Sequence, residues 1–163
     1  DDFDVDLKGD RSSFIFKSAS FIGPAQHLDQ QISLTHRGQS TTSQQQINNV
    51  GDTKSSVTCN GRILIEKEAS KASAALSNQN LSLGKGVTFN AKPELEIYND
   101  DVTCSHGATI GQLSDSELFY LASRGIDPES AKTMMAKGFL SKALDGPLAQ
   151  ESNRHFDQLF SVA

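Results

Sequence analysis

A weak repeat with a fixed spacing constrains the fold of this chain more than any other feature. Short segments that read VTCN, ASAA, VTFN and VTCS begin 15 residues apart, at Val57, Ala72, Val87 and Val102. Short strands at a fixed period with polar corners are typical of a solenoid, in which each coil covers the apolar edge of the coil before it. The spacing therefore predicts stacked coils.

Short alternating segments surround this repeat from Asp1 to about Gly111. They read FDVDL, ISLTH, VTCNGRILIE, LSL, VTFN and LEIY. Period-two alternation in runs this short predicts many brief, half-buried strands. A sandwich fits this alternation too. The polar run from Gly38 to Asn49 favours a parallel β-helix, because its amides can stack in ladders along the coils. Alternatively, that run is a disordered low-complexity loop.

After Gly111 the rhythm becomes helical. Ser114 followed by Glu117 is a capping-box signature, and Gly125 is a left-handed stop. Between them lie the apolar positions Leu118, Phe119 and Leu121. This pattern predicts one short helix.

A second helix is predicted from Asp127, its N-cap, and Pro128, its first residue, to a stop at Gly146-Pro147. Its apolar positions at roughly helical spacing are Met134, Met135, Phe139, Leu140 and Leu144. The interior Gly138 costs up to ~1 kcal/mol relative to Ala, which suggests close packing there.

A third helix is predicted from about Leu148 to Val162, with Phe156, Leu159 and Phe160 as its apolar residues. Three small amphipathic helices cannot bury all their apolar faces against one another. We therefore expect part of that surface to pack on the solenoid or to meet a partner.

Size and charge limit the classes of partner. At 163 residues the chain suits one domain, or one modest domain with an appendage. Its formal net charge of -5 and the lack of a Lys/Arg cluster argue against binding to nucleic acid. Apolar runs such as Ile63 to Ile65 fall far short of the ~20 residues of a membrane span. We expect a soluble protein without a nucleic-acid or membrane partner.

The start of the chain and its cysteines suggest its origin. The chain begins DDFDVDL, without an initiator Met or an apolar signal segment, so we expect a fragment or a processed chain. Cys59 and Cys104 are too few for the disulfide framework of a small secreted domain. Two reduced thiols in a cytoplasmic protein fit better, and Cys59 is expected to be a core or surface thiol.

Two potential donors stand two residues apart in the segment DDVTCSHGATIG, Asp100 to Gly111. Residues i and i+2 of a strand point to the same face, so Cys104 and His106 are expected to project side by side. The pair has three interpretations: an activated nucleophile, two ligands of a metal or cluster, or a buried thiol beside an inert histidine. Adjacent placement is poor geometry for a nucleophile and its base. The other histidines are remote in sequence, so a metal site is expected to be completed by another subunit.

Residues 92–127, KPELEIYNDDVTCSHGATIGQLSDSELFYLASRGID, closely resemble the SufB/SufD family of iron-sulfur cluster assembly scaffold proteins, and the SufD branch in particular. The similarity extends more loosely upstream through THRGQSTTSQQQINNVGDTKSSVTCNGRILI and downstream to about Leu144. It covers about Leu28 to Asp145. The family's members are considerably longer, so the resemblance implies that this chain is a C-terminal portion.

The resemblance implies a fold and a set of partners. The fold is mainly β, with the C-terminal coils of a right-handed parallel β-helix at residues 1–111 and a small helical domain at residues 112–163. The β-helix pairs with a SufB-like subunit and the helical domain docks a SufC-like ATPase. A transient iron-sulfur cluster forms at the partner interface and is not bound stably, and Cys104 and His106 match the positions implicated as its donors. No enzymatic activity is implied.

Two sequence features bear on these expectations. The segment Gly84 to Gly86, GKG, lacks the long glycine loop and the following Ser/Thr of a P-loop, so ATP binding is expected in the partner. Phe119, Tyr120, Met134 and Phe139 are candidate docking residues or core residues.

Alternatives to the scaffold function remain. They are a structural adaptor with an inert Cys-His pair, and a β-helix enzyme acting on polysaccharides. The enzyme is disfavoured by the lack of Trp and of clustered carboxylates. In isolation, an uncovered coil end would allow a homodimer.

Overall fold

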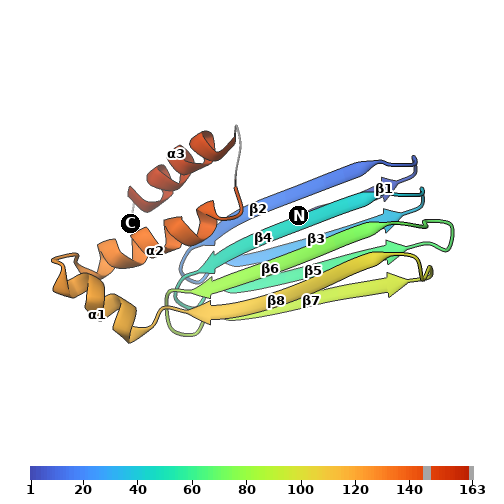
Figure 1. The fold of residues 1–163 in the computed structure, drawn as a ribbon. Helices are drawn as coiled ribbons and strands as arrows, with labels where there is room; N and C mark the ends of the chain where they lie inside the picture. The colour runs from blue at the N-terminus through green and yellow to red at the C-terminus, as the bar shows by residue number, and fades with distance from the viewer. Residues whose placement is uncertain (145–147, 162–163) are drawn as a thin grey trace.

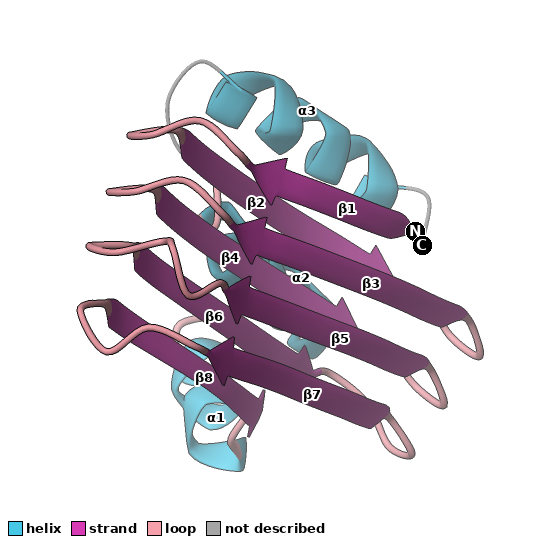
Figure 2. Cartoon of the chain, turned by 90° about the vertical axis from the view of Figure 1, so that its right-hand side faces the viewer, coloured by secondary structure: helices cyan, strands magenta, loops and turns pink. Residues whose placement is uncertain are grey.

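The computed structural model describes residues 1–144 and 148–161 and is built around a parallel β-helix (Figure 1). The described strands form two four-stranded parallel sheets, which we call sheet A (β1-β3-β5-β7) and sheet B (β2-β4-β6-β8). The strands are β1 (Asp2–Leu7), β2 (Ser13–Ile22), β3 (His27–His36), β4 (Thr42–Gly51), β5 (Ser56–Ile65), β6 (Ser73–Ser82), β7 (Thr88–Ile97) and β8 (Thr103–Gln112). Each coil adds one strand to each sheet (Figure 2). The predicted mainly β fold with parallel coils and short C-terminal helices is confirmed.

The 15-residue repeat of the sequence corresponds to half a coil. In sheet B, Ser73 pairs with Thr103, 30 residues later, as the repeat predicts. In sheet A, Val57 pairs with Phe89 and not with Val87. The corner between Ser82 and Thr88 keeps Val87 out of the strand, so β7 joins its sheet two residues later than the repeat indicates.

Left-handed residues turn the chain at the corners. In one column of corners they are Ala25 (φ 58°), Lys54 (φ 59°) and Gly86 (φ 73°). The amide of Ala25 donates to the Thr53 carbonyl at 3.0 Å, and the amide of Lys54 donates to the Lys85 carbonyl at 3.0 Å. The left-handed conformation thus satisfies corner amides on the next coil, at a cost of about 1–2 kcal/mol for a residue with a side chain.

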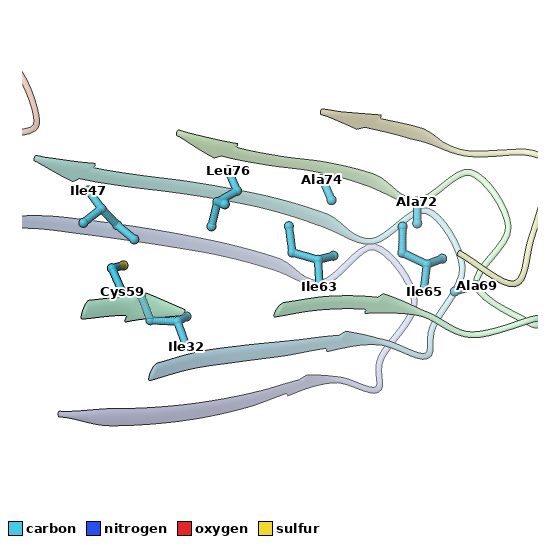
Figure 3. Packing of buried hydrophobic residues seen from close by; sticks show 9 residues of the cluster. All are labelled: Ile32, Ile47, Cys59, Ile63, Ile65, Ala69, Ala72, Ala74 and Leu76. Atoms are coloured by element: carbon cyan, nitrogen blue, oxygen red, sulfur yellow. The ribbon is translucent and has the colours of Figure 1, made fainter. Parts of the chain in front are cut away.

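The main apolar core fills the space between the two sheets, which we call the lumen (Figure 3). Its buried members are Ile32, Ile47, Cys59, Ile63, Ile65, Ala69, Ala72, Ala74 and Leu76. Gly61 of sheet A faces Leu76 of sheet B so closely that a Cβ at Gly61 would lie 2.9 Å from Leu76 Cδ1. The two sheets are therefore close-packed at this point.

Polar residues also enter the lumen and stack from coil to coil. Asn49 and Asn80 are in register on β4 and β6, and both are buried. The Asn49 side-chain amide donates to Asn80 Oδ1 at 3.1 Å. The polar ladder predicted for the run from Gly38 to Asn49 is therefore present at its last residue.

Other amides of the same run point outward and meet a helix. Gln46 Nε2 donates to the carbonyl of Lys142 at 2.9 Å, and Asn48 Nδ2 donates to the carbonyl of Phe139 at 2.8 Å. These carbonyls belong to the end of α2 (Pro128–Ser141), where they lack partners within the helix. Strand β4 thus fixes this helix end on the outer face of sheet B.

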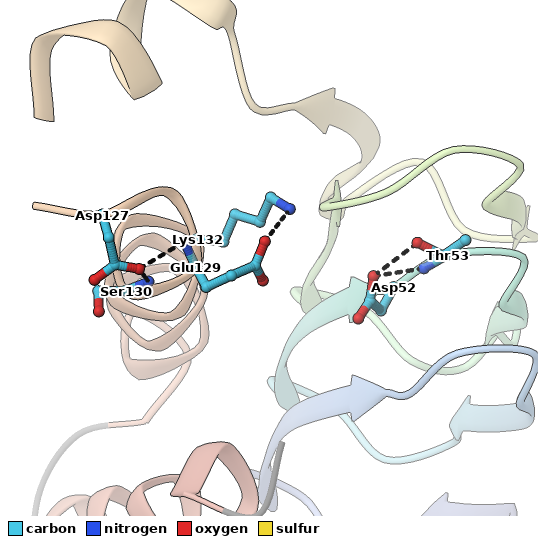
Figure 4. Close-up of polar contacts among 6 residues, drawn as sticks. All are labelled: Asp52, Thr53, Asp127, Glu129, Ser130 and Lys132. Atoms are coloured by element: carbon cyan, nitrogen blue, oxygen red, sulfur yellow. Dashed lines mark hydrogen bonds and ion pairs between the residues drawn. The ribbon is translucent and has the colours of Figure 1, made fainter. Parts of the chain in front are cut away.

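The helix starts agree with the sequence signals. α1 (Asp115–Ser123) begins after Ser114, which forms both halves of a capping box with Glu117. Gly125 follows the helix with a φ of 82°. Asp127 caps α2 by accepting from the amides of Glu129 and Ser130, and Glu129 pairs with Lys132 at 2.8 Å (Figure 4). The chain thus enters both helices through local side-chain contacts.

The helix ends agree less well with the sequence. α2 ends at Ser141, and the predicted stop at Gly146-Pro147 lies outside the described residues. α3 runs over Leu148–Ser161, and the predicted end at Val162 also lies outside them. The predicted close packing at Gly138 is wrong, because a Cβ added there would have no neighbour within 4 Å.

Helices α2 and α3 cover the outer face of sheet B. A second core joins Val50 and Leu81 of the sheet to Ala136, Leu140 and Phe156 of the two helices. Phe160 of α3 also contacts Phe21 of β2, with 4.5 Å between ring centroids. The expectation that the helices pack on the solenoid is confirmed. Among the described helices, none has the length and apolar character needed to span a membrane.

Candidate functional site

Cys104 and His106 lie on β8, the last strand of sheet B. Cys104 pairs with Ala74 and His106 with Leu76, and both partners are buried in the lumen. Residues in register on neighbouring parallel strands point to the same side of a sheet. Both donors are therefore on the lumen side of β8, as the spacing in the sequence predicts.

The Cys104 thiol is half-buried and packs against the lumen core together with Val102. Burial raises its pKa above the ordinary value, and a hydrogen bond with the backbone of Ala74 opposes that shift. The thiol form is therefore favoured at neutral pH. Because thiolate is the form that binds metal, ligation at Cys104 requires the loss of a proton.

The His106 side chain is exposed although it points to the lumen side. The reason is its place in the solenoid: β8 pairs with β6 on one edge and ends sheet B on the other. No further coil covers it. The imidazole is thus open to solvent, or to another molecule that approaches the end of the lumen.

Large apolar side chains surround this open end. Ile97 and Tyr98 at the end of β7 are 43% and 64% exposed, and Ile110 of β8 is 61% exposed. Strands β7 and β8 also end their sheets, so each has one edge without a neighbouring strand. Exposed apolar groups beside free strand edges are typical of a surface that pairs with another chain.

The other described histidines have separate structural roles. His36 is fully buried, with its ring nitrogens 2.8 Å from Thr41 Oγ1 and 2.9 Å from Ser43 Oγ. His27 lies at a corner, with Nδ1 2.7 Å from Ser56 Oγ. Within the described part of the chain, no three His, Cys, Asp or Glu side chains group closely enough to hold a metal ion.

Cys59 is a core thiol. It is 2% exposed, and burial, with a contribution from Asp29, raises its pKa to about 11. A buried, protonated thiol of this kind is unreactive. The structure therefore separates Cys59 from the donor pair on β8.

The helical domain carries a second exposed surface, which sequence alone could not separate from core. Phe119, Tyr120 and Met134 are 76%, 58% and 47% exposed, whereas Phe139 packs in the core between the helices and sheet B. A groove between α1 and α2 is lined by Ser116, Glu117, Tyr120, Leu121, Met134 and Met135. We call Phe119, Tyr120 and Met134 the helical patch.

The outer face of sheet A has a shallow depression that bears on the polysaccharide alternative. Its carboxylates are Asp2, Asp4 and Glu94. Glu94 pairs with Lys92 at 2.6 Å, and the aromatic residue in the lining is Phe3. Sugar hydrolysis needs two carboxylates that face each other across the bond, together with stacking aromatics. The depression does not show that arrangement.

Comparison with known proteins adds a family to this geometry. Residues 1–139 match the family described as SUF system FeS cluster assembly, SufBD core domain. The iron-sulfur cluster assembly protein SufD of Escherichia coli is 35% identical over 136 residues, which are 83% of this chain and 32% of that protein. The SufB protein of Bacillus subtilis is 30% identical over 151 residues, 91% of this chain and 32% of that protein.

A SufBD family protein of Synechocystis is 42% identical over 95 residues, which are 58% of this chain and 21% of that protein. The chain thus spans about a third or less of the length of these relatives.

Proposed function

The chain belongs to the SufBD core domain family of the SUF iron-sulfur cluster assembly system, and from this premise we propose that it is a SufD-like, non-enzymatic scaffold subunit. A nascent iron-sulfur cluster is its cargo, held transiently and passed on. In its function it acts with a SufB-like subunit and a SufC-like ATPase in the cytoplasm, where its two free cysteines stay reduced.

One observation carries the proposal. Cys104 and His106 share the lumen side of a terminal strand that no further coil covers. Thiolate and imidazole suit iron-sulfur centres, and two donors leave coordination positions for a second chain. A SufB-like subunit that pairs along the free edges of β7 and β8 supplies the remaining ligands. Cluster affinity then depends on the alignment of the two subunits, so a change of alignment can release the product.

The helical patch is the proposed docking surface for the ATPase. Its three residues are exposed and lie beside the apolar groove between α1 and α2. Exposed aromatic and Met side chains of this kind form the centres of protein interfaces. In this arrangement the ATPase acts on the helices, and the helices transmit its movement to sheet B through the contacts of β4 with the end of α2.

Anaerobic reconstitution tests the cluster site. The chain and a SufB-like partner are incubated with iron(II) and sulfide, and the visible absorbance of the cluster is followed. We expect His106→Ala to lower the cluster yield several-fold. Ser105→Ala is the matched control, because Ser105 is exposed on the other side of β8. An unchanged yield in His106→Ala contradicts the proposal.

A pull-down with a SufC-like ATPase tests the docking surface. We expect the double variant Phe119→Ser, Met134→Ser to lose binding while its thermal unfolding stays close to that of the wild type, because both residues are exposed. Leu159→Ser, at an exposed apolar position of α3, is the control. Equal binding of the two variants would place the ATPase elsewhere.

An inert adaptor is the second candidate, and the half-burial of Cys104 favours it, since a buried thiol often serves packing alone. It predicts normal ATPase binding with no cluster in the presence or absence of the partner. Self-pairing along β8 is a further outcome for the isolated chain. Sedimentation at several concentrations detects it, and addition of the SufB-like partner should displace the second copy.

A further inference from the structure

The strand that carries the donor pair is poorly packed. Of the ten residues of β8, Cys104 is half-buried and the others are exposed. Its neighbour β6 has five alternating or adjacent residues buried, Ala74, Leu76, Asn78, Asn80 and Leu81. Strands with few buried contacts open locally at low free-energy cost. Something other than apolar packing must therefore hold β8 in order.

A chain of buried asparagine amides leads through the lumen to this strand. Asn49 Nδ2 donates to Asn80 Oδ1 at 3.1 Å. Asn80 Nδ2 in turn donates to Asn78 Oδ1 at 3.0 Å and to the carbonyl of Thr109 at 3.1 Å. These contacts connect β4, β6 and β8, so they join three successive coils through side chains.

Asn80 has the key place in this chain. It is 2% exposed, and its side-chain oxygen and nitrogen are all engaged, so the amide group is fixed in orientation. Its contact on β8 lies three residues beyond His106, about 10 Å along an extended strand. An apolar side chain at this position would fill the lumen but would give β8 no donor.

We propose that Asn80 is a positioning residue: its amide secures the carbonyl of Thr109, keeps terminal strand β8 ordered, and thereby presents Cys104 and His106 to the partner subunit. The last step of this proposal rests on the proposed scaffold function. The first step, that Asn80 orders β8, does not depend on it.

Hydrogen exchange of the backbone amides tests the first step. We expect Asn80→Ala to accelerate exchange in residues 107–112 by about tenfold or more, because a buried hydrogen bond to the strand is lost. Amides of β5 serve as the internal reference for global stability. Asn49→Ala is the matched control: it removes the same side chain one coil away, in the same ladder, and leaves the contact with Thr109.

The exchange results divide clearly. Faster exchange of β8 in Asn80→Ala, with β8 unchanged in Asn49→Ala, supports the proposal. Equal acceleration in both variants, or none in Asn80→Ala, overturns it. If Asn80→Ala does not fold, Asn80→Ser replaces it, because the serine hydroxyl is too short to reach the Thr109 carbonyl but fills more of the site.

Cluster reconstitution with the SufB-like partner tests the second step. Asn80→Ala should lower the yield of cluster absorbance by about threefold or more, while Asn49→Ala stays near the wild type. Rapid exchange with a full yield overturns the link between strand order and the donors. A wild-type chain that forms no cluster defeats the scaffold function instead, and the exchange comparison still decides whether Asn80 orders β8.

Discussion

At Cys104, burial and ligand chemistry oppose each other. Contact with the lumen core raises the pKa of the thiol, whereas a metal binds the thiolate. Iron binding must therefore expel a proton. We expect the iron(II) affinity of the chain with its SufB-like partner to rise by up to about tenfold per pH unit between about pH 7 and 8. Equilibrium titration at fixed ionic strength measures this slope.

The assignment of that pH slope requires a variant. Cys104→Ser removes the thiol and should flatten the slope, although Cys59 is still present. Cys59 contributes nothing expected in this range, because burial raises its pKa to about 11 and it lies in the core. An unchanged slope in Cys104→Ser would show that another group releases the proton.

His36 makes stability depend on pH in a defined direction. Burial lowers its pKa below the usual value, so the folded chain favours the neutral ring. As pH falls below about 6.5, the unfolded chain takes up a proton first and stability declines, by at most about 1.4 kcal/mol per pH unit. Above that pH the contribution is complete.

Urea unfolding between about pH 7.5 and 5.5 measures this effect. His36→Gln keeps a polar side chain near Thr41 and Ser43 but does not titrate. It should therefore be less stable than the wild type at high pH and should show a shallower decline. Parallel curves for the two proteins would exclude His36 as the source.

The donor pair shows what sequence can predict at this scale. The i, i+2 spacing places Cys104 and His106 on one face of a strand, because alternation is a local property of the backbone. Their exposure is not local. It depends on whether another coil follows β8, and the lumen contact of Cys104 depends on sheet A opposite. Sequence alternation contains neither fact.

At the scale of single elements, β4 uses its two faces differently. Ser43, Gln45 and Asn49 face the lumen, whereas Gln46 and Asn48 face α2. The sequence predicts amide ladders here, and one of them exists between Asn49 and Asn80. The helix contact could not be predicted, because the partner carbonyls lie more than 90 residues away in the sequence.

Asn48 is expected to fix the end of α2 on the solenoid. Asn48→Ala removes the donor to the Phe139 carbonyl and should lower the free energy of unfolding by about 1–3 kcal/mol. Gln44→Ala, on the same face of β4 but exposed, should change it by less than about 0.5 kcal/mol. Urea unfolding followed by circular dichroism measures both. Equal losses would show that Asn48 acts through strand propensity alone.

Helix starts and helix ends differ in how far sequence determines them. Ser114 with Glu117, and Asp127 with Pro128, act through contacts within a few residues, so their patterns are sufficient. The end of α2 depends on contacts with β4. Gly138 was a weak signal for the same reason: a glycine in a helix allows close packing but does not require it.

At the scale of the whole molecule, the repeat gives the coil but not its register. Sheet B follows the 15-residue spacing, whereas the corner before β7 shifts sheet A by two residues. An even shift preserves which side chains face inward, so the lumen tolerates it. A shift by one residue would expose the core. The hydrophobic alternation therefore restricts the corner lengths without fixing them.

The distance between the sheets is set by complementary sizes across the lumen, most clearly at Gly61 and Leu76. A methyl group at Gly61 would come within 2.9 Å of Leu76 Cδ1, so Gly61→Ala should lower the free energy of unfolding by about 1–3 kcal/mol. Leu76→Ala should cost about 2–5 kcal/mol through the cavity it leaves. In the double variant the new methyl group enters that cavity.

The double variant should therefore be less destabilised than the sum of the single changes by about 1 kcal/mol or more. Urea unfolding of the four proteins in the cycle measures this coupling. Gly107→Ala is the control, because a Cβ at Gly107 of β8 would meet nothing within 4 Å and should be additive with Leu76→Ala. Additivity at Gly61 as well would mean that the two sheets can move apart, and that the coils are not held at a fixed spacing by their side chains.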